Sequence, residues 1–229
     1  MDLRKITNER RRSMLLEKGS RLIMVGDSIT DCGRDYNAQP AGWGSFGEGY
    51  VNLVNAFLTG LCPQYEIMVI NKGVNGNTIV DLKERWEKDV LALQPDWVSV
   101  MIGVNDVWRH FDTVLQQIKG TTIEEYERTY RQLVDSMRDR VKGIIIMSPF
   151  MIEPNKKDEM RQMVEEYAAV ARKIAREYGL IYADIQAAVD NYLEHLSPYI
   201  ISADRVHPNL SGHMIIAREF MKSIEFEWK

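Results

Sequence analysis

The chain has 229 residues, of which 45% are hydrophobic and 27% are charged, and its formal net charge is −4. This length and hydrophobic fraction suit one α/β domain with a single substantial core. The absence of a basic excess argues against a nucleic-acid-binding protein and favours a small neutral substrate. We find no apolar run long enough to span a bilayer, so no association with a membrane is expected.

The start of the chain is charged throughout and lacks the apolar core of a secretory signal peptide, which predicts a cytoplasmic protein. We expect one domain over residues 1–229, with residues 1–19 as a charged N-terminal extension. The three arginines at 10–12 are expected to be a solvated segment, and an arm that packs on a partner subunit is the alternative. Between the predicted elements, no linker or repeat marks a domain boundary.

Five short apolar runs predict the strands of a parallel sheet, because each run is short enough for a strand that is buried on both faces. The runs are residues 22–25, 67–70, 97–102, 144–147 and 180–183.

Apolar residues with helical spacing lie between these runs and predict crossover helices. The two clearest sets are Ile79, Leu82, Trp86, Val90 and Leu93, and Ile123, Tyr126, Tyr130, Leu133 and Met137. Thr78 and Thr122 precede these sets, and an acid follows each threonine after three residues, which is the spacing of a helix-capping pair. The alternation of strands and helices predicts a three-layer α/β/α fold with a five-stranded parallel sheet.

Polar residues collect where three of the predicted strands end, which is where ligands bind in open parallel α/β sheets. The segments are 26–30 (Gly-Asp-Ser-Ile-Thr), 71–78 (Asn-Lys-Gly-Val-Asn-Gly-Asn-Thr) and 103–106 (Gly-Val-Asn-Asp). We therefore expect the three segments to converge on one edge of the sheet.

A serine hydroxyl is a weak nucleophile until a base accepts its proton, and the base needs a third group to fix its tautomer. His207 lies in a compact turn near the C-terminus, three residues after Asp204. We predict Ser28 as the nucleophile, His207 as the general base and Asp204 as its orienting partner. Their wide separation in sequence is no objection, because such triads are defined by geometry.

Acyl transfer also needs hydrogen-bond donors directed at the developing oxyanion. We predict three donors, which are the Ser28 backbone amide, the Gly76 backbone amide and the Asn105 side chain. Glycine at position 76 leaves room for an approaching ester carbonyl.

Each motif alone has a simpler interpretation. Gly-Asp-Ser and Gly-Val-Asn-Gly are common turns, Gly-Val-Asn-Asp can be a helix cap, and Asp-x-x-His can be a surface hydrogen bond or half of a metal site. The four motifs occur together, however, at positions that converge on one site. This conjunction predicts a serine esterase.

The four motifs resemble those of the SGNH subclass of the GDSL hydrolases, which supply serine, glycine, asparagine and histidine. Ile29 stands where the family name expects leucine, and Thr30 breaks the Gly-x-Ser-x-Gly pattern of α/β-hydrolases. Residues 71–78, 94–103 and 105–109 resemble intracellular xylan acetylesterases. The resemblance implies a flavodoxin-like fold, removal of acetyl groups from acetylated xylo-oligosaccharides or xylan, a homo-oligomer, and no metal or organic cofactor.

Other functions remain open for this sequence. The same triad could serve a short-chain carboxylesterase, a thioesterase or a lysophospholipase, and a sugar-binding protein could retain the fold without the chemistry. A metal hydrolase built on Asp204 and His207 is a weaker alternative, because zinc usually takes three protein ligands. Four aromatic residues could line a sugar site or belong to the core: Trp43, Trp108, Phe150 and Tyr199.

Overall fold

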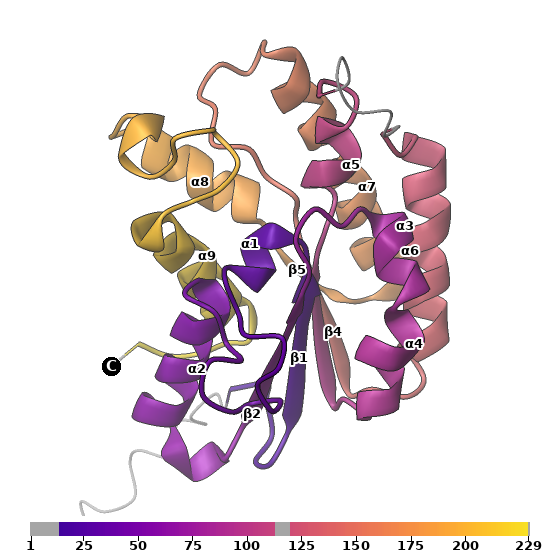
Figure 1. The fold of residues 1–229 in the computed structure, drawn as a ribbon, viewed down its shortest axis with the longest axis vertical. Coiled ribbons are helices and arrows are strands. Elements are labelled where there is room, and N and C mark those ends of the chain that lie inside the picture. The colour runs from indigo at the N-terminus through magenta and orange to yellow at the C-terminus, as the bar shows by residue number, and fades with distance from the viewer. Residues whose placement is uncertain (1–13, 113–119, 229) are drawn as a thin grey trace, which may run out of the picture.

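The computed structural model describes residues 14–112 and 120–228, and it contains a five-stranded parallel sheet in the order β2-β1-β3-β4-β5 (Figure 1). The strands are β1 (Arg21–Gly26), β2 (Met68–Gly73), β3 (Trp97–Met101), β4 (Gly143–Met147) and β5 (Ile181–Ala183). All five overlap the predicted apolar runs, so the predicted α/β fold is confirmed. The strand order reverses between β1 and β3, which is the position where such sheets bind ligands.

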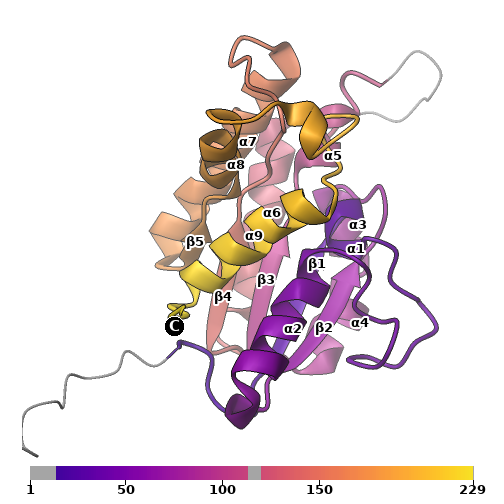
Figure 2. The same cartoon turned by 90° about the vertical axis from the view of Figure 1, so that its left-hand side faces the viewer.

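Helices cover both faces of the sheet (Figures 1 and 2). On one face lie α2 (Tyr50–Leu61), α8 (Ile185–Leu193) and α9 (Leu210–Ser223). On the other lie α3 (Ile79–Glu84), α4 (Trp86–Asp89), α6 (Ile123–Met137) and α7 (Glu159–Tyr178). Two short helices, α1 (Ser28–Asp31) and α5 (Val104–Trp108), begin just beyond the carboxyl ends of β1 and β3. The 3-10 helices are Pro63–Tyr65, Leu91–Leu93 and Pro198–Ile200.

The capping residues lie where the sequence predicts helix starts. Thr78 and Asp81 form a reciprocal capping box at the start of α3, and the Thr122 side chain accepts a hydrogen bond from the Glu125 amide at the start of α6. These bonds satisfy amide groups that have no partner within the helix. In α6, the five apolar residues of the predicted face are buried or packed against the core.

The apolar stretch from Ile79 to Leu93 is not one crossover helix, as its spacing predicts. It is divided into α3, α4 and the 3-10 helix Leu91–Leu93. The first break is at Arg85, whose ψ of 2° interrupts the helix. The Arg85 side chain donates hydrogen bonds to the carbonyl oxygens of Gly26 and Lys72, at 2.9 and 2.8 Å. At the break, the Arg85 side chain therefore connects the end of β1 to the end of β2.

Strand β2 continues past its predicted end to Gly73 because these residues stay in register with β1, and the polar side chain of Asn71 is buried there. The Asn71 side-chain amide donates to the carbonyl oxygens of Thr30 and Phe46, at 2.7 and 2.9 Å. Buried polar groups are tolerated when they are paired in this way. Asn71 thus joins the end of β2 to the segment that follows β1.

Part of the expected N-terminal extension packs on the domain. Met14 and Leu16 are buried, and the Leu15 amide donates to the Ile224 carbonyl oxygen at 2.9 Å. Residues 1–13, which include the three arginines at 10–12, lie outside the described residues. Within the described chain, no helix is long and apolar enough to cross a membrane.

Candidate active site

Ser28 is the first residue of α1, and only Asp27 separates it from β1. The Asp27 side chain caps this helix by accepting a hydrogen bond from the Ile29 amide at 3.0 Å. Gly26 packs so tightly that a Cβ there would collide with the carbonyl oxygen of Met101 on β3. The Gly-Asp-Ser sequence therefore fixes the serine close to the end of β3.

The segment 103–106 connects the end of β3 to the loop before α3. The Asn105 side-chain amide donates to the Asn77 carbonyl oxygen at 3.1 Å. The buried Asp106 carboxylate accepts from the Ile79 amide at 3.0 Å. Asp106 thus caps α3 rather than its own helix, and the two bonds hold Asn105 beside the loop that contains Gly76. Gly76 has a φ of 75°, in the left-handed region that favours glycine.

Asp204 and His207 lie in a turn between α8 and α9. One Asp204 carboxylate oxygen accepts from the Val206 and His207 amides, at 2.9 and 2.8 Å. The other lies 2.6 Å from His207 Nδ1, and His207 Nε2 lies 2.8 Å from Ser28 Oγ. The carboxylate favours the imidazole tautomer with the proton on Nδ1, which leaves Nε2 free to accept the serine proton.

Most of the predicted site residues line one pocket of about 500 Å³. The lining residues include Ser28, Gly76, Asn105 and His207. Asp204 does not line the pocket, but it contacts the imidazole of His207 through Nδ1. The structure therefore brings all five predicted residues together. A hollow of about 580 Å³ between α8 and α9 lacks a hydrogen-bonded serine and histidine.

Hydrogen bonds within the turn favour the ionised form of the Asp204 carboxyl group. Burial raises the pKa of this group, but the hydrogen bonds from the His207 side chain and from the His207 and Val206 amides outweigh burial and lower the pKa to about 2. Asp204 is therefore ionised at neutral pH and can stabilise a positively charged imidazole.

Two other carboxyl groups near the site behave differently. Burial raises the pKa of Asp27 to about 7 and that of Asp106 to about 6, although hydrogen bonds from backbone amides oppose the rise. Both side chains accept hydrogen bonds at helix starts. Their role in the structure is to position loops rather than to exchange protons with a substrate.

The pocket also contains residues beyond the predicted triad and oxyanion hole. Trp108 packs against His207 with ring centroids 5.8 Å apart, and the Arg109 guanidinium pairs with Asp112 at 2.9 Å. His213 Nε2 lies 3.2 Å from Cys32 Sγ. Burial first, and then the nearby His207, lower the pKa of His213 to about 4, so His213 is neutral at pH 7. Trp108 is one of the four aromatic candidates from the sequence, whereas Arg109 and His213 are not predicted to line the site.

The four aromatic candidates lie in three different environments: the pocket, the core and the exposed surface. Trp108 lines the catalytic pocket, whereas Phe150 is buried in the core. Trp43 and Tyr199 are exposed and do not line the pocket. Only Trp108 of the four is placed to contact a substrate at Ser28.

The contacts of His207 argue against a metal site on Asp204 and His207. Asp204 and His207 contact each other directly at 2.6 Å and the second ring nitrogen faces Ser28, so the two side chains are not directed at a common ion. In residues 14–112 and 120–228, no group of three or more histidine, cysteine, aspartate or glutamate side chains is arranged to hold one.

The three-layer α/β fold and the serine hydrogen-bonded to a histidine define a serine hydrolase. Residues 24–215 match the GDSL-like lipase/acylhydrolase family. The chain belongs to this family. It is 49% identical over 218 residues to an acetylxylan esterase of Geobacillus stearothermophilus, covering 94% of this chain and 98% of that protein.

Solved structures agree with this assignment. A crystal structure of an acetylxylan esterase from Geobacillus stearothermophilus superposes with a TM-score of 0.91 at 47% identity, covering 94% of this chain and 98% of the other. An α/β hydrolase enzyme from the metagenome of Lake Arreo, Spain, superposes with a TM-score of 0.92 at 42% identity, covering 95% and 100%. Other structures of the Geobacillus esterase are described as catalytic mutants, in which a serine, an aspartate or a histidine is replaced by alanine.

Proposed function

We propose that this protein is an esterase that removes acetyl groups from acetylated xylo-oligosaccharides or xylan. The observation that carries the proposal is the hydrogen-bonded chain from Ser28 through His207 to Asp204, which lies at a pocket that Gly76 and Asn105 also line. This arrangement supplies a nucleophile, a base and donors for an oxyanion.

In the proposed mechanism, Ser28 Oγ attacks the acetyl carbonyl while His207 Nε2 takes the hydroxyl proton. The oxyanion accepts hydrogen bonds from the Ser28 amide, the Gly76 amide and the Asn105 side chain. His207 then gives its proton to the departing sugar oxygen, which leaves an acetyl group on Ser28. Water, activated by His207, releases acetate in a second round of the same steps.

The catalytic mutants of the Geobacillus esterase support the assignment of the three residues. In that protein the replaced serine and histidine are 179 positions apart, as Ser28 and His207 are. Its replaced aspartate precedes the histidine by 3 positions, as Asp204 precedes His207. The spacing supports equivalent roles in this chain.

The lining of the pocket favours a sugar ester over a long acyl chain. Asn75, Arg109 and Asp112 make its walls polar, and polar walls suit the hydroxyl groups of a sugar better than an apolar acyl chain. The alternative is a short-chain carboxylesterase, thioesterase or lysophospholipase that uses the same triad. Faster hydrolysis of aryl butyrate or longer esters than of aryl acetate would favour this alternative.

The test compares the wild type with Ser28→Ala, His207→Ala and Asn105→Ala on an aryl acetate and on acetylated xylo-oligosaccharides. We expect loss of detectable turnover for the first two variants and a loss of about 10²- to 10³-fold for Asn105→Ala. Labelling of the wild type by an organophosphate, read by intact mass, checks the nucleophile independently. Wild-type turnover in the Ser28→Ala protein contradicts the mechanism.

The proposal includes a single domain, a cytoplasmic location and a homo-oligomeric state. It takes the location and the oligomeric state from the resemblance to intracellular xylan acetylesterases. Cell fractionation tests the location, and light scattering on the purified protein tests the oligomeric state. A monomer across the working concentration range contradicts the proposed assembly.

A further inference from the structure

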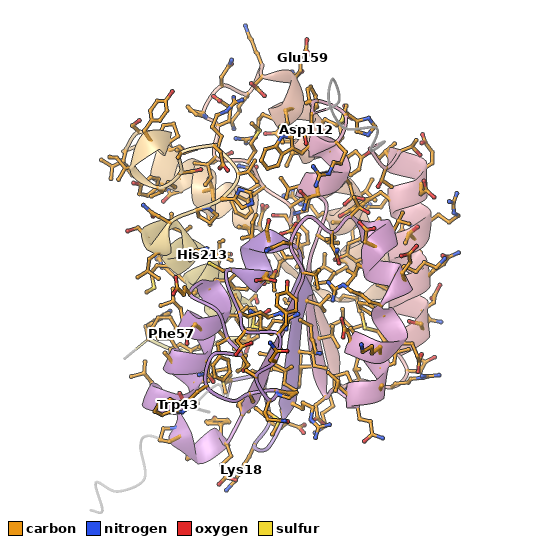
Figure 3. The ribbon with its side chains drawn as sticks, viewed as in Figure 1. Lys18, Trp43, Phe57, Asp112, Glu159 and His213 are labelled. Carbon is orange, nitrogen blue, oxygen red and sulfur yellow. The ribbon has the colours of Figure 1, made fainter. Side chains whose placement is uncertain are left out.

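A second hollow of about 350 Å³ lies next to the catalytic pocket and shares a wall with it. The shared wall is Trp108, which lines both hollows. The lining of the second hollow comprises Trp108, Phe111, Asp158, Glu159, Met160 and Arg205. Figure 3 shows Asp112, which follows Phe111, and Glu159 at the same end of the molecule. The walls therefore come from the end of α5, the start of α7 and the turn that carries His207.

The proposed reaction decides which part of a substrate lies toward this hollow. His207 must reach the leaving oxygen to protonate it, so the sugar of the ester lies on the imidazole side of the site. Trp108 packs against that imidazole, with ring centroids 5.8 Å apart and planes tilted by 51°. A sugar that leaves from Ser28 is thus next to Trp108, and a chain attached to that sugar extends toward the second hollow.

The chemistry of the hollow fits a second sugar unit. A pyranose ring has apolar faces and a rim of hydroxyl groups. The aromatic rings of Trp108 and Phe111 supply apolar surface, and Phe111 is 42% exposed. Glu159 supplies a carboxylate for hydroxyl groups at the edge, and Arg205 and Asp158, which pair with each other at 3.0 Å, add a charged rim beside it.

We infer that this hollow is a sugar subsite that binds the xylose unit adjacent to the acetylated one. The inference rests on the proposed function and names a specificity element of the same site. It assigns to the protein a preference for acetylated oligosaccharides over acetylated xylose itself. The preference arises because only the oligosaccharide reaches both hollows at once.

The test measures kcat and KM on three acetate esters: an aryl acetate, acetylated xylose and acetylated xylotetraose. Phe111→Ala is expected to raise KM for the tetrasaccharide and to lower kcat/KM by about fivefold. Activity on the two smaller esters is expected to stay within about twofold, because Phe111 lies beyond Trp108 on an exposed surface. Phe111→Tyr retains an aromatic face and is expected to restore the tetrasaccharide activity.

Trp43→Ala is the matched control, since Trp43 is an aromatic residue with 99% exposure that lies toward the opposite end of the molecule (Figure 3). It is expected to leave all three activities unchanged. An equal effect of Phe111→Ala on all three esters, or no effect on any, overturns the subsite. Equal kcat/KM of the wild type on acetylated xylose and on acetylated xylotetraose also overturns the subsite. That result leaves the proposed esterase function standing. A wild type that deacetylates neither sugar overturns the proposed function itself.

Discussion

Arg205 Nη1 lies 2.6 Å from a carboxylate oxygen of Glu153, and this ion pair joins the turn of His207 to the segment between β4 and α7. The same guanidinium nitrogen donates to Asp158 at 3.0 Å, and the Arg205 carbonyl oxygen accepts from the Ile152 amide at 2.7 Å. Arg205 has a φ of 69°, which a residue with a side chain adopts only when its surroundings hold it there. These contacts therefore fix the backbone between Asp204 and His207.

We expect Arg205→Ala to lower kcat on an aryl acetate by about 10- to 100-fold, because small misplacements of a catalytic group have effects of that size. KM should change little, since the side chain does not line the pocket at Ser28. Steady-state kinetics check both values.

Two further variants separate the ion pair from the backbone conformation. Arg205→Gly adopts positive φ readily but loses both ion pairs, and Arg205→Lys keeps a positive charge. We expect the lysine variant to be more active than the glycine variant. A fully active glycine variant shows that the ion pairs do not position His207.

Much of the fold is predictable because its strands are buried on both faces. Such strands are continuous apolar runs in the sequence, and the functional motifs follow directly after them. The hydrogen-bonded contact among Ser28, His207 and Asp204 is predictable for a related reason, since Asp204 and His207 are close in sequence and Ser28 follows the first strand.

The residues that brace the site are not predictable, because their partners are distant in sequence. Arg85 contacts the carbonyl oxygen of Gly26, 59 residues away, and Arg205 contacts Glu153, 52 residues away. An arginine on a predicted helix gives no sign that it turns inward. The division between α3 and α4 follows from such a contact, so helical spacing alone predicts a single helix.

Gly76→Ala is expected to impair catalysis more than folding. Alanine at a φ of 75° costs about 1–2 kcal/mol, and its Cβ would lie 3.4 Å from Arg109 Nη2. A shift of the loop would misdirect the Gly76 amide, so we expect kcat to fall at least about tenfold. Steady-state kinetics measure this loss, and urea unfolding measures the change in stability.

Gly60→Ala is the matched control for this prediction. Gly60 lies within α2, and a Cβ there meets no atom within 4 Å. The substitution should stabilise the protein by about 0.5–1 kcal/mol and leave kcat unchanged. Equal kcat in the two variants contradicts a role of Gly76 in the oxyanion hole.

Asp27→Asn is expected to change how stability depends on pH. Burial raises the pKa of Asp27 to about 7, whereas an unfolded aspartate titrates near 3.9. Between these values the folded protein holds a proton that the unfolded chain has lost, so this group makes the free energy of unfolding decrease as pH rises from about 4 to 7. Above pH 7 the effect is constant.

Asparagine keeps the acceptor for the Ile29 amide but does not ionise. The stability of the variant relative to wild type should therefore increase by on the order of 1 kcal/mol per pH unit between about pH 4 and 7. Urea unfolding at pH 5, 6, 7 and 8 measures the difference. A difference that stays constant from pH 5 to 7 shows that burial does not raise the pKa of this group.

Arg161 connects stability to the catalytic turn. Its side chain is fully buried, and its guanidinium donates to Asp190 at 2.8 Å, to Glu165 at 2.6 Å and to the Glu153 carbonyl oxygen at 2.6 Å. Arg161→Met removes this donor, but the two carboxylates remain partly exposed to water, so we expect a loss of about 1–3 kcal/mol in the free energy of unfolding. Urea unfolding measures this loss.

The exposed ion pair of Arg172 with Asp184 provides the comparison, since Arg172→Ala should cost less than about 1 kcal/mol. Arg161 holds the backbone of Glu153, and the Glu153 side chain holds Arg205, so Arg161→Met should also lower kcat under conditions where the protein remains folded. Arg172→Ala should leave kcat unchanged. An Arg161→Met protein that is destabilised but has wild-type kcat shows that the turn keeps its geometry without Arg161.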